Sequence, residues 1–422
     1  MKLQKIVSRL QKLHPKQIDL SLNRVINLCE KLGNPQDKIK AISIVGTNGK
    51  YSTIQAMFAM LKEANLKCNI YTSPHIKKIN ERFVFNNQEL DDKKLANLLE
   101  EVEKVNENKP ITFFEILTAA YFYKASEYPN NINLIETGLF HRFDATNILK
   151  KNLASVVTSI GLDHLDWLPE NQQTIKKIIY EKTSTLLHSN IIIAKQNSNK
   201  INNQIKKTIS KNKSDKIFYN QDYNYSLNEN NFIYYEDKIG SLKLPNPNIN
   251  GIFQLENIAT AIATLRSLKD LNIKESHIKV GVTKIKSIAR LQEITNGKLK
   301  NLVKYNRLIV DGSHNPLGAK VLNEYLDSLN CNKHIILGMM ANKNHKEFVS
   351  YFKDISSLTT INIPNQPNSI KGNELKDKLK NFKNISYKES IIDAINSIQL
   401  KENDILLITG SLYLAGEVLN LN

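Results

Sequence analysis

Short apolar runs rich in β-branched residues alternate with longer stretches of helical periodicity, and this alternation is the strongest constraint on the fold. The runs in the first part of the chain are 41–46, 68–73, 132–138, 155–161 and 190–195. Apolar residues recur at three- and four-residue spacing over 52–64, 92–106, 114–127 and 172–187. Buried strands joined by helices are what a parallel sheet with right-handed crossovers requires. The sequence therefore predicts an α/β fold with a mainly parallel sheet flanked by helices.

A second series of apolar runs begins near residue 300 and predicts a second domain. Its members are 307–313, 334–340, 359–364 and 405–411, again with helical stretches between them. Residues 217–245 break the pattern and predict an antiparallel hairpin with a glycine-containing turn. A chain of 422 residues is also too long for one simple core. We predict two domains, over 1–288 and 301–422, with a linker over 289–300.

The net charge of +17 has three explanations: nucleic-acid binding, steering of anionic substrates, or compositional drift toward lysine. Basic residues form no long cluster, and aromatic residues are not interleaved with them as a stacking platform would need. We favour drift and expect no nucleic-acid partner.

Membrane and disulfide signals are weak in this sequence. No apolar run approaches the roughly 18–20 residues that cross a bilayer, and the first residues do not resemble a secretory signal. The cysteines, Cys29, Cys68 and Cys331, are far apart and predict neither a disulfide framework nor a zinc site. We expect a cytoplasmic protein with no membrane partner.

The strongest chemical signal is a glycine-containing loop between the first predicted strand and a helix. It consists of Gly46, Thr47, Asn48, Gly49, Lys50, Tyr51, Ser52 and Thr53. In such a loop, consecutive N–H groups point inward at a phosphate near a helix N-terminus. Lys50 would reach the terminal phosphates, and the hydroxyl of Ser52 or Thr53 would meet Mg²⁺. An ordinary turn is the alternative, but the order of strand, loop, lysine and helix favours a P-loop NTPase-like first domain.

Three polar residues, Ser73, Glu136 and His164, follow predicted strands of this sheet. Ligands of open α/β sheets bind beyond the carboxyl ends of the strands, so all three are expected to face the phosphate loop. A hydroxyl, a carboxylate and an imidazole would hold a divalent ion there, although Mg²⁺ prefers oxygen ligands. Each residue alone is better explained as a cap or turn residue, but their convergence favours a metal site.

In the second, Rossmann-like domain, Asp311 and His314 lie between a predicted strand and a helix. They either stabilise a turn or contact a ribose or phosphate, and their spacing leaves both roles open. Asn315 and Pro316 are typical helix-start residues. Arg290, in the predicted linker, would reach a triphosphate only on domain closure.

Together these motifs resemble the dihydrofolate synthase/folylpolyglutamate synthase family of the Mur-ligase superfamily, nearly end to end. The phosphate loop is shared by Mur ligases in general, whereas Ile18–Leu20, Thr112–Glu115 and Phe143–Asn147 resemble the folate branch. The resemblance implies a nucleotide site that includes Asn257, Arg290 and Asp311 beside the phosphate loop, and Mg²⁺ ligands at Ser73, Glu136 and His164. It implies pterin-substrate contacts from Ile18, Asp19, Leu20, Thr112, Phe113, Phe114, Phe143, Asp144 and Ala145.

Lys182 is similar to a lysine that the family carbamylates, which would convert a cationic amine into an anionic oxygen ligand. A surface lysine on a helix that starts near Gln172 is the alternative. The resemblance thus implies Lys50, Lys182 and His164 as catalytic residues.

This chain departs from the family pattern at three places. Tyr51 stands where a glycine is usual, which is tolerable only if residue 51 has helical backbone angles. Phe140–His141 replaces a usual Gly-Gly pair, and Thr183–Ser184 follows Lys182 in place of Ala-Gly. We expect the first two to affect the nucleotide and substrate sites, and the third to weaken the case for carbamylation.

The resemblance implies a monomeric, ATP-dependent ligase that forms carbon–nitrogen bonds. ATP would phosphorylate the carboxylate of dihydropteroate, of a folate, or of both, and the amine of L-glutamate would attack the acyl phosphate. Two alternatives are a Mur-type ligase acting on a UDP-linked carboxylate and a catalytically impaired nucleotide-binding descendant.

Overall fold

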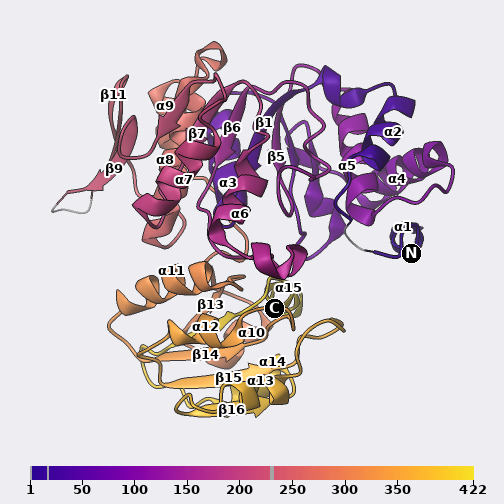
Figure 1. The fold of residues 1–422 in the computed structure, drawn as a ribbon. Coiled ribbons are helices and arrows are strands. Elements are labelled where there is room, and N and C mark those ends of the chain that lie inside the picture. The colour runs from indigo at the N-terminus through magenta and orange to yellow at the C-terminus, as the bar shows by residue number, and fades with distance from the viewer. Residues whose placement is uncertain (1, 17–18, 229–231) are drawn as a thin grey trace. The chain divides into compact units, whose positions relative to one another are not determined.

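The computed structural model describes residues 2–16, 19–228 and 232–422, which form two compact units (Figure 1). The first unit comprises residues up to His164, Leu168–Asn248 and Leu255–Lys286. The second comprises Leu165–Trp167, Ile249–Gln254 and Ser287–Asn422. Each unit holds its own large, mainly parallel sheet flanked by helices, so the predicted α/β class is confirmed.

The first unit is built on an eight-stranded sheet of order β4-β3-β2-β5-β1-β6-β7-β8. Its strands are β1 (Lys40–Val45), β2 (Cys68–Tyr71), β3 (Phe83–Phe85), β4 (Gln88–Glu89), β5 (Ile132–Glu136), β6 (Ala154–Val157), β7 (Asn190–Ile193) and β8 (Lys216–Phe218). Along the part of the sheet with the order β2-β5-β1-β6-β7-β8, every neighbouring pair is parallel. At one edge, β3 and β4 add antiparallel pairs. The five predicted runs are therefore the five central strands, and Figure 1 shows β7, β6, β1 and β5 side by side.

Helices connect these strands, as the periodicity predicted. The helices up to residue 282 are α1 (Lys2–Leu10), α2 (Asn23–Lys31), α3 (Lys50–Glu63), α4 (Asp92–Asn106), α5 (Phe113–Ala125), α6 (Ile175–Thr183), α7 (Asn199–Thr208), α8 (Ile252–Ser267) and α9 (Glu275–Val282). Short 3₁₀ helices are Pro35–Lys38, Ile79–Arg82, Leu165–Trp167, Glu170–Gln172 and Lys269–Leu271. α5 has no polar face, and its buried residues belong to the core that lies against β2 and β5. A helix without a polar face has to be buried in this way. Within the described residues, no helix has the length and apolar character needed to span a bilayer.

The predicted hairpin is confirmed, but it belongs to a separate three-stranded sheet. β10 (Ile233–Asp237) pairs antiparallel with both β9 (Tyr223–Leu227) and β11 (Gly240–Leu244). No apolar run marks β9 in the sequence, because only its first residue is buried.

The second unit carries a six-stranded sheet of order β12-β13-β17-β14-β15-β16. Its strands are β12 (Gln292–Ile294), β13 (Arg307–Val310), β14 (Lys333–Leu337), β15 (Ser357–Ile361), β16 (Ile385–Lys388) and β17 (Ile405–Thr409). Its helices are α10 (Lys298–Val303), α11 (Pro316–Asp327), α12 (His345–Ser350), α13 (Gly372–Lys378), α14 (Ile391–Ser397) and α15 (Leu412–Leu421). β12, inside the segment predicted as a linker, pairs antiparallel with β13, and the other pairs are parallel.

Candidate active site

The predicted phosphate loop runs from the end of β1 into α3. Gly46 and Gly49 both have positive φ, 156° and 89°. The amides of Thr47 and Asn48 donate to the carbonyl of Ser159, at 2.9 and 3.2 Å. The expectation that consecutive loop amides point at a phosphate is therefore wrong for these two, because the segment after β6 uses them to hold the loop. The first turn of α3 begins at Lys50, and a helix supplies no acceptor of its own for its first amides.

Tyr51 is the second residue of α3 and therefore has helical backbone angles. This is the condition under which a side chain larger than glycine is tolerated at that position. Ser52 and Thr53 follow in the same turn and are buried, and the hydroxyl of Thr53 has no hydrogen-bond partner.

Gly49 is required by both its backbone angle and its surroundings. A Cβ atom at this residue would lie 2.4 Å from Oδ1 of Asn257, which α8 contributes. The structure therefore places the predicted residue Asn257 against the phosphate loop.

Replacing Gly49 with alanine is expected to destabilise the protein by about 1–3 kcal/mol, because it adds left-handed strain and a clash. Urea unfolding measures this change. Gly240→Ala is the matched control, because Gly240 also has a positive φ of 134° but no atom lies within 4 Å of the added Cβ. We expect a smaller loss in the control; equal losses would contradict the role of the Asn257 contact.

Lys50 and Glu136 face each other at the carboxyl edge of the sheet. The Lys50 ammonium donates to the carbonyls of Gly46 and Thr47, both at 3.2 Å, and lies 3.8 Å from Oε1 of Glu136. Glu136 is the last residue of β5, and its Oε2 accepts from the backbone amide of Ser73 at 3.3 Å. Both side chains are almost fully buried, where a Coulomb interaction is strong. Two of the three predicted metal ligands, Ser73 and Glu136, are thus in contact beside Lys50.

His164 follows β6 and has a left-handed backbone, with φ of 57°. Such a conformation is uncommon for a residue other than glycine and often marks a functional position. Its amide donates to Oδ1 of Asp163 at 2.9 Å, and its ring packs edge-on against Phe140 at 6.4 Å between centroids. Among the described residues, no three His, Cys, Asp or Glu side chains cluster in a way that would hold a metal. A cation here would thus need the Ser73 hydroxyl and oxygens from the substrate in addition to Glu136 and His164.

Lys182, in the last turn of α6, is fully buried rather than on the surface. Its Nζ donates to the carbonyls of Gly46 and Leu139, at 2.9 and 2.8 Å, and lies 5.7 Å from the centre of the Phe140 ring. Burial, aided by the positive charge of Lys50, lowers the pKa of Lys182 to about 7. The alternative of a surface lysine is therefore wrong.

The structure joins the predicted pterin-contact segments by polar contacts. Arg24 donates to the carboxylate of Asp19 at 2.8 Å and makes two hydrogen bonds of 3.0 Å with Glu115. Glu115 accepts from the amide of Thr112, and Thr112 in turn caps α5. Ile18 lies outside the described residues, whereas Leu20 and Phe113 are half-buried at this place. A guanidinium therefore connects the first two segments.

Gly138 lies between the second and third of these segments. A Cβ at Gly138 would be 3.1 Å from both the Phe114 ring and Oδ2 of Asp144. The buried carboxylate of Asp144 accepts from the amides of Gly138, at 2.9 Å, and Leu139, at 3.2 Å, and from the Thr146 hydroxyl. Burial raises the pKa of Asp144. On one side of Asp144, Ala145 is buried. On the other side, the Phe143 ring lies 4.1 Å from the Arg142 guanidinium carbon.

In the second unit, Asp311 stabilises the backbone. Its two carboxylate oxygens accept from the amides of Leu291 and Ser313, both at 2.8 Å. Nδ1 of His314 lies 2.9 Å from the carbonyl of Gly312, so this nitrogen carries the proton. Arg290 donates to the carbonyl of the residue before it at 2.9 Å. The predicted cap is confirmed, because Asn315 accepts from an amide of α11 and a proline follows it.

Two supporting residues were missed by sequence reasoning, because their partners are distant in the chain. They are Arg24 and Ser159. Arg24 lies 91 positions from Glu115, and no local pattern marks such a pair.

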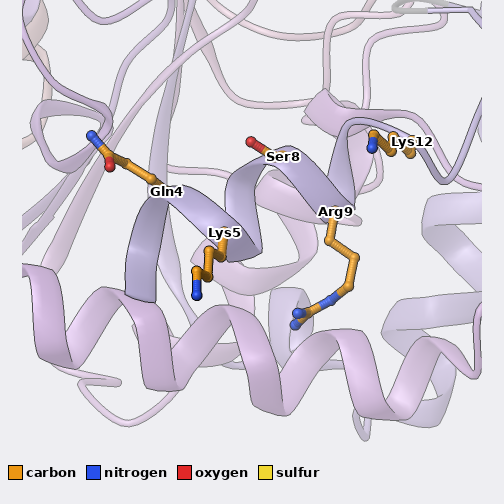
Figure 2. A pocket seen from close by; sticks show the side chains of 5 residues that line it. All are labelled: Gln4, Lys5, Ser8, Arg9 and Lys12. Carbon is orange, nitrogen blue, oxygen red and sulfur yellow. The ribbon is translucent and has the colours of Figure 1, made fainter. Parts of the chain in front are cut away.

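A surface hollow beside α1 contains none of the predicted site residues. Figure 2 shows its lining residues, Gln4, Lys5, Ser8, Arg9 and Lys12. The Arg9 guanidinium already pairs with the carboxylate of Glu103. This hollow therefore adds nothing to the candidate active site.

The fold and the phosphate loop define a ligase of the Mur class: a parallel sheet whose first strand leads into a lysine-bearing loop, and a second α/β unit. Residues 298–412 of that unit match the family described as "Mur ligase, glutamate ligase domain". The chain is 30% identical to the dihydrofolate synthase/folylpolyglutamate synthase of Buchnera aphidicola subsp. Baizongia pistaciae, covering 93% of this chain and 89% of the relative. The chain belongs to the dihydrofolate synthase/folylpolyglutamate synthase family.

Two further comparisons agree with this assignment. The Haemophilus influenzae enzyme of the same name is 28% identical, over 97% of this chain and 95% of its own length. The solved structure of Escherichia coli FolC in complex with DHPP and ADP has a TM-score of 0.86 and 26% identity, covering 99% of this chain and 97% of that one. The chain is therefore a ligase that forms carbon–nitrogen bonds.

Proposed function

We propose that this protein joins L-glutamate to dihydropteroate, to a tetrahydrofolate, or to both, with ATP as the energy source. The observation that carries the proposal is the meeting of Lys50, Glu136 and Ser73 at the carboxyl edge of a family-typical sheet. The names of the relatives support both activities, and E. coli FolC binds DHPP and ADP.

The residues at this edge fit a magnesium ion. Ser73 and Glu136 offer oxygen ligands, and His164 would supply a nitrogen. Mg²⁺ is usually held by few carboxylates together with substrate phosphates and waters, which suits a site with one glutamate. The ion would neutralise charge on the triphosphate.

The reaction needs positioning and neutralisation of charge more than it needs a protein nucleophile. In the first step, a carboxylate oxygen of the acid attacks the γ-phosphorus, and ADP leaves. The glutamate amine then attacks the acyl carbon, loses a proton, and inorganic phosphate departs with the carboxylate oxygen. We assign Lys50 to the γ-phosphate, and the loop residues 46–52, Asn257, Arg290, Asp311 and His314 to the nucleotide.

We assign the acid substrate to the segments joined around Arg24 and Gly138. Asp19, Leu20, Thr112, Phe113 and Phe114 belong to the first two, and Phe143, Asp144 and Ala145 to the third. Ile18 adjoins the first segment in the sequence. Asp144, with a raised pKa, is suited to hydrogen bonding in a buried site.

A carbamate on Lys182 fits its surroundings less well than the amine does. Nζ has two carbonyl acceptors at 2.9 and 2.8 Å, and a carbamate nitrogen keeps one hydrogen only. The added carboxylate would also lie among carbonyl oxygens, which repel it. We therefore route no step through a carbamate.

Incubation with ATP, Mg²⁺ and L-glutamate is expected to convert dihydropteroate or tetrahydrofolate to a product heavier by one or more glutamyl residues. Mass spectrometry of the products measures this directly. Extension of dihydropteroate alone would restrict the proposal to the synthase activity. ATP binding with no product from either acid would contradict the proposal and favour a catalytically impaired descendant.

A Mur-type ligase acting on a UDP-linked carboxylate remains the second candidate. Phosphate release that depends on such an acid, and not on a pterin, would favour it.

We further propose that the enzyme is a cytoplasmic monomer with domains over 1–288 and 301–422. Light scattering tests the monomeric state, and limited proteolysis of the whole chain tests the domain boundaries.

A further inference from the structure

The segment that follows β6, residues 158–161, holds the phosphate loop in place, and we call it the β6 loop. The carbonyl of Ser159 accepts from the amides of Thr47 and Asn48, at 2.9 and 3.2 Å. The hydroxyl of Thr47 lies 3.1 Å from both the amide nitrogen and the carbonyl oxygen of Gly161. A hydroxyl accepts from the first and donates to the second, so that both of its functions are used here. The shape of the phosphate loop therefore depends on the path of the β6 loop.

Strand pairing stops short of the contact between these two loops. The pairing of β6 with β1 and with β7 ends at Val157. The amide of Thr158 still donates to the carbonyl of Val45, at 2.8 Å. On the other side, the amide of Ala194 still donates to the carbonyl of Val157, at 2.9 Å. The carbonyl of Ser159 lies beyond these bonds, so other contacts must determine its position.

Gln196 supplies such contacts from the segment that follows β7. Its Oε1 accepts from the amide of Ile160 at 2.9 Å. Its Nε2 donates to the carbonyls of Thr158, at 3.2 Å, and Ala194, at 2.9 Å. Only one orientation of the side-chain amide fits, because backbone carbonyls accept and a backbone N–H donates. The side chain thus holds the backbone on both sides of Ser159, whose own carbonyl faces the phosphate loop.

We propose that Gln196 is a positioning residue for the nucleotide: its amide fixes the β6 loop, and the carbonyl of Ser159 in turn fixes the phosphate loop. This inference rests on the proposed function, which assigns ATP to the phosphate loop. Gly46 and Gly49 allow that loop many backbone conformations, so that it needs outside support to keep one of them. Transfer of a phosphoryl group requires exact alignment, and a misplacement of about 1 Å costs roughly 10²-fold in rate.

Two variants of Gln196 remove this support in different ways. Gln196→Glu keeps the shape and the acceptor for Ile160 but places an oxygen opposite the carbonyls of Thr158 and Ala194. Gln196→Met removes all three hydrogen bonds without adding a charge. We expect both variants to weaken ADP binding about tenfold, as measured by calorimetry, because the loop loses its fixed shape.

The same variants should show a selective loss in the steady-state rate. We expect kcat/KM for ATP to fall on the order of 10²-fold, whereas KM for the pterin acid should stay unchanged. Gln221→Glu is the matched control, because it makes the same change at an exposed position in the turn after β8. It should bind ADP and turn over like the parent.

Two results of these measurements would overturn the proposal. Parental ADP affinity in both variants, with only a lowered Tm, would restrict Gln196 to a role in the stability of the fold. Weakened ADP binding in Gln196→Glu alone would assign the effect to the added negative charge.

Hydrogen exchange of the ligand-free protein gives a second measurement that requires no turnover. The amides of Thr47 and Asn48 should exchange faster in both Gln196 variants than in the parent, because their acceptor is no longer held. The amides of β14, in the second unit, should not change. Unaltered exchange at Thr47 and Asn48 would overturn the proposal. If the parent forms no amide from any pterin acid, the proposed function fails, and ADP binding and hydrogen exchange still decide the role of Gln196.

Discussion

Lys50→Ala is expected to lower kcat by a factor on the order of 10³ or more, because Lys50 supplies the positive charge assigned to the γ-phosphate. Its ammonium lies 3.8 Å from Oε1 of Glu136 and 3.2 Å from the carbonyls of Gly46 and Thr47, and the side chain is almost fully buried. Steady-state phosphate release with a pterin acid and glutamate measures the effect.

The fold should survive this substitution, because the core of α3 does not include Lys50. A single cooperative thermal transition checks that point. Lys62→Ala, at an exposed position in the last turn of the same helix, should leave kcat unchanged. Near-parental turnover by Lys50→Ala would contradict the role assigned to the loop.

Glu136→Gln is expected to lower kcat on the order of 10²-fold and to raise the concentration of Mg²⁺ needed for half-maximal rate. The change keeps the shape of the side chain but removes the carboxylate that faces Lys50 and the amide of Ser73. The rate is measured at increasing concentrations of Mg²⁺. A rate that recovers at high Mg²⁺ indicates weakened binding of the ion, whereas an unfolded variant would not recover.

Glu63→Gln is the matched control for this variant, because Glu63 pairs with Lys284 at the surface. Its magnesium dependence should match that of the parent. An unchanged magnesium requirement in Glu136→Gln would remove Glu136 from the metal site.

Most of the fold was predictable, because the buried strands are continuous apolar runs. β1, β5 and β7 have nearly all residues buried and stand out in the sequence. β16 was missed since its four residues are only half-buried, so that no apolar run marks them. β12 was missed because it is three residues long and follows a turn.

The residues of the candidate site were predictable where they lie at or just after the carboxyl end of a strand. Lys50, Ser73 and Glu136 were found because topology alone brings the carboxyl ends of parallel strands together. The acceptor for the loop amides, the carbonyl of Ser159, was not predictable, because any residue carries a carbonyl. The burial of Lys182 likewise depends on how α6 packs on the 138–144 turn, which residue spacing does not specify.

The central claim is that ATP activates a pterin carboxylate as an acyl phosphate before glutamate attacks it. Dihydropteroate labelled with ¹⁸O in its carboxylate tests this claim most directly, with the mass of the released phosphate as the readout. Our account predicts that each phosphate carries one labelled oxygen and that this transfer accompanies amide formation. Amide formed together with unlabelled phosphate would contradict it.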